Sequence, residues 1–306
     1  MQIRGRALYN LLRLTEVDRR NVKKWQIENY RQLSDEDIFD RLSNLKIFID
    51  YESFPHFARS VDTPEELLEY LVSTEYSQPQ AEQIYLLLFE LWRRHLKGRE
   101  SLSILCDELD HLMEQYDNGH GEVAEDLYSD LYQLVDIIDE SVNEEQSANE
   151  VLEYISSYLA HDLESFLYDF IGHLIENQEE SAASELIEGY EDYVTNKQEL
   201  EFLKLKLIFA SDAVETDGMM ALFSDELVEE GNVDLACDFL DFILKEGEIF
   251  TFFTLFPKVL SLVANKLQYA KLIKIASGYL DTLDSKHEHR LLLHELIEKK
   301  SAEFPM

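Results

Sequence analysis

The chain has 306 residues, with 63 Asp or Glu against 27 Lys or Arg, so its formal net charge at pH 7 is −36. A hydrophobic content of 45% is enough for a full core and excludes a disordered polar chain. A protein with this charge repels nucleic acid and anionic membrane, and it favours basic partners. The longest apolar run, residues 249–256, is far shorter than the roughly 20 residues of a membrane span. Cys106 and Cys237 are the only cysteines, which excludes a disulfide framework and favours a cytoplasmic location.

Residues 1–33, here called the basic head, carry eight Lys or Arg residues and three acids. The first fifteen residues lack the uniform apolar segment and small-residue cleavage site of a signal peptide, so they predict a first helix. Leu8, Leu11, Leu12, Leu14 and Trp25 supply an apolar side. We expect this side to pack on the acidic body, either in the same molecule or in a second copy.

The next segments contain clear helix boundaries. Ser34-Asp35-Glu36-Asp37 and Thr63-Pro64-Glu65-Glu66 combine an N-cap residue with acids in the first turn. Residues 51–62 are predicted to form a loop between these two starts. Residues 84–92 are apolar nearly all round and predict a central helix. That helix ends in the basic cluster 93–99, where Gly98 is expected to cap it.

Residues 101–196, here called the acidic stretch, contain 26 Asp or Glu residues and no Lys or Arg. Such a stretch has no internal salt bridges with Lys or Arg, and its self-repulsion costs stability. An apolar core, the basic head or a basic partner must offset that repulsion. This asymmetry is the strongest functional signal in the sequence.

Residues 122–142 show how the acids are arranged on a helix. At 100° per residue, Val123, Leu127, Leu131, Leu134, Val135 and Ile138 share one side. The opposite side, here called the acidic face, consists of Glu122, Glu125, Asp126, Asp130, Asp136 and Glu140. We predict that these six residues bind a partner. Apolar stripes at the same spacing predict further helices over 102–116 and 159–174.

Beyond residue 180, expected helix starts lie near 181, 197, 217, 233, 249, 265 and 286. Asn232 is expected to cap the helix 233–245, and Gly247 to follow it. Pairs of 30–36 residues have the period of stacked helical hairpins. The sequence therefore predicts an all-α protein with a helical bundle over residues 1–178, followed by stacked antiparallel helical hairpins over 179–306.

Residue patterns that could carry chemistry have simpler explanations. Glu108–His111, Asp117–His120 and Asp284–His287 match the Glu-x-x-His spacing of di-iron bundles. With nine His and 63 acids, about two such pairs arise by chance, so no metal site is expected. His161, Asp162, Glu164, Tyr168, Asp169 and His173 are interpreted as a solvated helix face. Both cysteines are interpreted as inert core thiols.

These features favour a non-catalytic interaction module (a scaffold, adaptor or chaperone-like protein) that binds a basic protein through its acidic face. No catalytic residue, cofactor, nucleic-acid partner or membrane partner is expected, and association of two copies is left open. One alternative is a nucleic-acid mimic that inhibits a DNA-binding protein. A second alternative is a metalloprotein or enzyme of the helical-bundle type.

Deletion of residues 1–33 tests the role assigned to the basic head. Because the deletion removes a net charge of +5 from a molecule whose remaining charge is −41, we expect thermal stability to fall and to depend more steeply on salt. Thermal unfolding across a salt series measures both effects. Unchanged stability together with lost binding to anionic vesicles would instead identify a membrane anchor.

Overall fold

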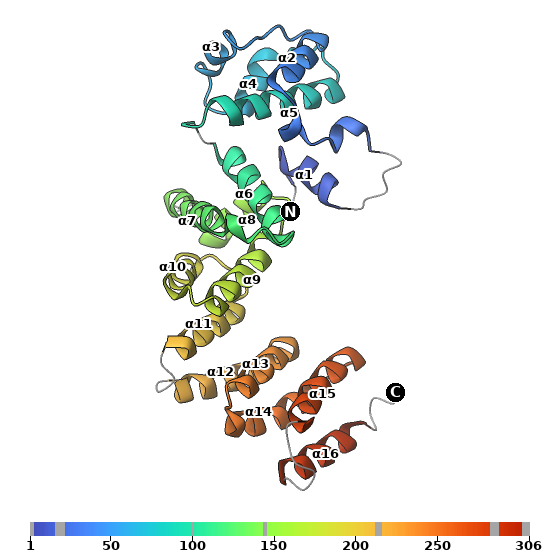
Figure 1. The fold of residues 1–306 in the computed structure, drawn as a ribbon, viewed down its shortest axis with the longest axis vertical. Coiled ribbons are helices and arrows are strands. Elements are labelled where there is room, and N and C mark those ends of the chain that lie inside the picture. Colours follow the sequence, from blue (N-terminus) through green and yellow to red (C-terminus); the bar gives the residue numbers. More distant parts are fainter. Residues whose placement is uncertain are drawn as a thin grey trace. The chain divides into compact units, whose positions relative to one another are not determined.

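A computed structural model describes residues 3–15, 22–99, 101–142, 146–211, 216–281 and 288–301 of the protein. Within these ranges the chain forms 16 α-helices and three short 3₁₀ helices, and none of these residues belongs to a strand (Figure 1). The all-α prediction is confirmed. No helix in the described ranges has both the length and the apolar content needed to cross a bilayer.

The chain divides into two compact units, and the boundary falls within helix α9. Unit 1 comprises residues 1–169 and 192–195, and unit 2 comprises residues 170–191 and 196–306.

Unit 1 contains the first eight helices and the start of the ninth. They are α1 (Ala7–Leu14), α2 (Asp35–Asn44), α3 (Phe54–Ala58), α4 (Pro64–Leu71), α5 (Gln78–His95), α6 (Leu102–Asp117), α7 (Ala124–Ser141), α8 (Ala148–Ser156) and α9 (Leu163–Glu176). The 3₁₀ helices are η1 (Lys24–Gln26), η2 (Tyr30–Gln32) and η3 (Gly121–Val123). The predicted first helix is present as α1.

Helix α5 is the centre of the N-terminal core. Every residue from Ile84 to Trp92 is buried, as the apolar run predicted. Helices α2 and α4 pack against α5, and Leu42 and Leu67 from these helices are fully buried. The predicted starts of both helices are also confirmed. The Ser34 side chain caps α2 in a capping box with Asp37, and Thr63 Oγ1 accepts from the Glu66 N–H.

Helices α6, α7 and α9 are amphipathic in the predicted register. In α7, all apolar residues expected to face inward are buried except Val123, which lies in η3 and is half-buried. The apolar residues expected on the α9 stripe, from Leu159 to Leu174, are all buried. In α6, Leu102, Leu112 and Tyr116 are half-buried and the other stripe residues are buried.

Unit 2 contains the remaining helices. They are α10 (Glu180–Tyr190), α11 (Lys197–Ser211), α12 (Thr216–Glu230), α13 (Val233–Lys245), α14 (Ile249–Leu262), α15 (Lys266–Asp281) and α16 (Glu288–Ser301). All seven start within two residues of the predicted positions. Contacts join α10 to α11, α11 to α12, α12 to α13 and to α14, α13 to α14 and to α15, and α15 to α16.

The core of unit 2 is aromatic as well as aliphatic. Phe202 of α11, Phe223 of α12 and Phe239 of α13 form mutual ring contacts at centroid separations of 5.1–6.0 Å. All three are buried, so the rings join three helices through geometry that adds to simple area burial. Cys237 is buried beside them, and burial raises the pKa of its thiol to about 11. This agrees with an inert core thiol.

Two local expectations are wrong. Residues 54–58 inside the predicted loop 51–62 form the short helix α3, because Phe54 and Ala58 at its two ends are buried in the core. Gly98 does not cap α5, which ends at His95 without a left-handed glycine. Gly247 does occupy the left-handed conformation after α13, with φ at +85°, and the Glu248 N–H donates to the Ile243 carbonyl.

Two glycines in unit 2 offer a matched test of these helix boundaries. A Cβ added at Gly278 inside α15, or at Gly231 after α12, would meet no atom within 4 Å. Gly231 has φ at +72°, whereas Gly278 has ordinary helical backbone. We expect Gly278→Ala to raise unfolding free energy by about 0.5–1 kcal/mol. Gly231→Ala should lower it by about 1 kcal/mol. Chemical denaturation measures both, and shifts of the same sign would contradict the assigned boundaries.

Candidate interaction surfaces

The basic head docks on helix α6 through a buried carboxylate. Asp107 is only 3% exposed. Its carboxylate accepts from Arg31 at 2.6 Å, from the Asn10 amide at 2.8 Å and from Arg6 Nε at 3.3 Å. Burial by itself raises the pKa of Asp107, but the Arg31 and Arg6 guanidinium groups and the Asn10 hydrogen bond outweigh it and lower the pKa to about 2.

A second buried carboxylate extends this network to α5. Glu90 accepts from both Arg93 and Arg94, each at 2.6 Å. Glu108 connects the Asp107 contacts with the Glu90 contacts, because it accepts from Arg31 at 2.9 Å and from Arg93 at 3.0 Å. The basic cluster 93–99 therefore forms internal ion pairs, in addition to its favourable position at a helix C-terminus.

A third buried carboxylate, Asp110, ties α6 to the segment between α8 and α9. It accepts from the backbone N–H groups of Ala160 and His161 at 2.9–3.1 Å. The His161 Nδ1 lies 2.9 Å from Asp110 Oδ1, and the Asn10 amide donates to Asp110 Oδ2 at 3.2 Å. His161 was expected on a solvated face and instead belongs to this buried contact. Asp162, Asp169 and His173 are exposed as expected.

Two buried residues of α1 support the same docking. Ala7 and Tyr9 of α1 are buried, and the Tyr9 ring lies 6.0 Å from the Trp25 ring. At the outer end of α1, Arg13 forms two hydrogen bonds with Glu114, at 2.7 and 2.9 Å. The head thus packs on the acidic body of the same molecule, one of the two expected arrangements. The apolar side predicted for this contact is only partly covered, because Leu8 is 42% exposed and Leu11, Leu12, Leu14 and Trp25 are half-buried.

Helix α7 carries most of the predicted partner-binding residues, and most of their side chains are exposed to solvent. Glu125, Asp126, Asp136 and Glu140 are exposed on α7, and none has a hydrogen bond or ion pair with another described side chain. Glu122 is also exposed but lies in η3, where His120 Nδ1 is 3.0 Å from its carboxylate.

Asp130 departs from the expectation for the acidic face, because it is half-buried rather than exposed. The acidic face thus consists of five exposed residues and one at its margin. Since the acidic stretch contains no Lys or Arg, its own sequence offers these carboxylates no Lys or Arg partner.

Tyrosines add an aromatic component to the acidic face. Tyr132 is 44% exposed on α7, and its ring lies 6.2 Å from that of Tyr128. Tyr193 donates a hydrogen bond to Asp139, another exposed acid of this helix. The position of Tyr132 beside Asp136 could be read from the helical spacing, whereas its exposure depends on which neighbours cover α7.

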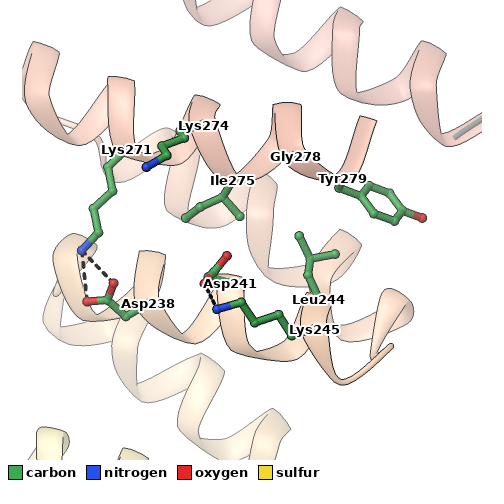
Figure 2. Close-up of a pocket in the computed structure, with 9 residues that line it drawn as sticks. All are labelled: Asp238, Asp241, Leu244, Lys245, Lys271, Lys274, Ile275, Gly278 and Tyr279. Carbon is green, nitrogen blue, oxygen red and sulfur yellow. Dashed lines mark hydrogen bonds and ion pairs between the residues drawn. The ribbon is translucent and has the colours of Figure 1, made fainter. Parts of the chain in front are cut away.

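Unit 2 has a groove between α13 and α15 that sequence spacing did not reveal (Figure 2). Its volume is about 620 Å³, and Leu244, Ile275 and Gly278 supply its apolar lining. Figure 2 shows Lys271 directed at Asp238, with a separation of 2.9 Å, and Lys245 beside Asp241 at 2.8 Å. Because two of its lysines are already paired with groove aspartates, the groove has little net charge.

The described residues contain no group of three or more His, Cys, Asp or Glu side chains that could hold a metal ion. Glu108 is committed to arginines, and His111 Nε2 lies 2.9 Å from the Gln115 amide. Asp284 and His287 lie outside the described residues. No protein-family model, curated protein or solved structure matches this chain. Its function is therefore inferred from its surfaces.

Substitution of Asp107 tests the docking of the head. Asp107→Asn leaves Arg6 and Arg31 without their shared counter-charge, so we expect it to lower unfolding free energy by about 3 kcal/mol or more. Glu114→Gln breaks a partly exposed pair and should cost less than about 1 kcal/mol. Urea denaturation of the two variants measures the difference. Equal losses would contradict a central role for Asp107.

The pH dependence gives an independent check of the same residue. The folded pKa of about 2 lies below the value of roughly 3.9 for an unfolded Asp. The unfolded state therefore binds the proton more readily, and the stabilisation is present above pH 4 and lost as pH falls towards 2. For the wild type this loss is about 2–3 kcal/mol. Asp107→Asn should lack this part of the acid sensitivity.

Proposed function

We propose that the protein is a non-catalytic interaction module that binds a basic protein partner through the acidic face of α7. One observation carries the proposal. Glu125, Asp126, Asp136 and Glu140 are exposed and have no side-chain partner among the described residues. By contrast, Asp107, Glu108 and Asp110 of the neighbouring helix α6 are held by arginine, asparagine, histidine or backbone N–H groups.

The order of side chains along α7 indicates the kind of partner that would fit. Glu125, Tyr132, Asp136 and Glu140 are spaced by seven, four and four residues, which places them in one row roughly 22 Å long. A basic segment with Lys or Arg side chains along one face would meet a carboxylate or a ring after every one or two helical turns. Charge pairs set the approach of such a segment, and Tyr132 adds a cation–π contact.

Another tyrosine of the acidic stretch forms a cation–π contact with an arginine of the same chain. The Arg4 guanidinium lies over the ring of Tyr154 at 5.2 Å from the centroid, although Tyr154 remains partly exposed. This contact supports the idea that acids with interleaved tyrosines suit Arg-rich and Lys-rich segments.

We further propose that residues 179–306 form a stack of antiparallel helical hairpins that serves as a scaffold. Helix spacing supports this arrangement, as do the contacts between most successive helices and those of α12 with α14 and of α13 with α15. A cytoplasmic location is proposed with it, since both cysteines are buried and free, as a reducing compartment favours.

Binding of a short lysine-rich peptide tests the proposal. A triple variant, Glu125→Gln with Asp136→Asn and Glu140→Gln, removes three exposed charges from the acidic face. We expect it to weaken binding about tenfold at low salt, since exposed pairs contribute at most about 1 kcal/mol each. Raising salt from about 50 mM to about 500 mM should weaken wild-type binding and shrink this difference. Isothermal titration calorimetry measures both effects.

A matched control removes the same charge from a different helix. Glu226, Glu229 and Glu230 are exposed on α12, and their replacement by Gln should change affinity much less. Equal losses in the two variants would show that net charge, rather than the acidic face, binds the peptide. If a natural partner of the protein is displaced from it by duplex DNA, the nucleic-acid mimic becomes the better explanation.

A further inference from the structure

Helices α14 and α16 present an apolar groove that the proposed function does not use. Its volume is about 600 Å³, and it is lined by Ile249, Phe250, Phe253, His289, Leu291, Leu292 and Glu295. Phe250 is 85% exposed and Leu291 is 68% exposed. Clustered large apolar side chains at a surface mark an interaction site, whereas a single exposed one does not.

The groove is bounded by fixed aromatic side chains. Phe253 packs against two rings, with the His289 ring at 4.3 Å and the Tyr279 ring at 5.9 Å. Behind it, Phe252 is fully buried and its ring lies 5.4 Å from that of Phe253. Because these aromatic side chains are already packed against one another, they lose little conformational freedom when a partner binds over them.

The surface around the groove carries almost no net charge. Helix α14 contains Lys258 and no acid, and α16 contains three acids and three Lys or Arg residues. The two helices together therefore carry +1, from four basic residues and three acids, in a chain of net charge −36. By contrast, α7 alone carries six acids and no basic residue.

We propose that the occupant of this groove is the same groove of a second copy of the chain. A basic partner would find only the carboxylate of Glu295 in the lining, and an acidic partner would be repelled by the rest of the molecule. Two copies repel each other least where both surfaces are near neutral, as on α14 and α16.

An exposed apolar ring beside an apolar groove allows contact between identical surfaces. Phe250 is 85% exposed and lines the groove together with Phe253, Leu291 and Leu292. A two-fold axis requires one patch to complement itself. In such a dimer Phe250 of each copy fills the groove of the other, and both rings become buried at the interface.

Salt separates this contact from partner binding on α7. Because two anionic molecules repel each other, screening should strengthen their association. Binding of a basic partner to the acidic face should weaken under the same change. The two proposals can therefore fail independently.

Sedimentation equilibrium of the full chain tests the dimer at low and high salt. We expect a monomer–dimer equilibrium whose association constant rises between about 50 mM and about 500 mM salt. Phe250→Asp should weaken association at least tenfold, because two rings lose their apolar contact in each dimer and two charges take their place. Circular dichroism and thermal unfolding of the variant verify that the exposed substitution leaves the fold intact.

Phe48→Asp is the matched control, since Phe48 belongs to unit 1 and is 78% exposed. It should leave the association constant unchanged. A wild-type chain that stays monomeric at about 100 µM in high salt would overturn the proposal, even if another protein binds the groove. So would a dimer that weakens with salt, a dimer insensitive to Phe250→Asp, or assembly beyond two copies.

Discussion

The pairing of Asp107 with Arg6 and Arg31 is the contact on which the fold of unit 1 depends, because it neutralises a carboxylate that the fold buries. A carboxylate buried on α6 costs several kcal/mol when it has no counter-charge, and the acidic stretch around it contains no Lys or Arg. The basic head supplies the missing cations from residues 76 and 101 positions earlier in the chain. Glu108 extends the same contact to α5, and Asp110 extends it to the segment between α8 and α9. Unit 1 therefore depends on the head for its charge balance as well as for part of its core.

The acids of α6 and α7 fall into two groups. Four acids of α6 are used inside the molecule, where arginines and backbone N–H groups satisfy them: Asp107, Glu108, Asp110 and Glu114. The acids of α7 other than the half-buried Asp130 face outward, and Glu125 and Glu140 have no side-chain partner in the described part of the chain. Self-repulsion among the outward acids is a cost that a basic partner would relieve. The proposed function follows from that second group, and the near-neutral groove on α14 and α16 concerns a different part of the surface.

Local features of the sequence were enough to predict most helices, because they depend on neighbouring residues. Asn232 and Val233 mark the start of α13, and the apolar spacing of α7 placed its buried side. Features that depend on distant residues were not predictable in the same way. Phe54 and Ala58 form a helix in an expected loop because the core buries them, and Asp130 is half-buried despite its acidic neighbours. The partners of Asp107 were foreseen only as a general attraction between the head and the body.

Carbodiimide cross-linking of a lysine-rich peptide to the intact protein, followed by peptide mass spectrometry, tests the central division most directly. The reagent joins amines to carboxylates that lie in contact, so it reports which acids the peptide meets. The account predicts salt-sensitive cross-links to Glu125, Asp136 and Glu140 on α7 and none to Asp107, which is buried against the head. Cross-links spread evenly over the exposed acids, or concentrated on α6 after displacement of the head, would contradict it.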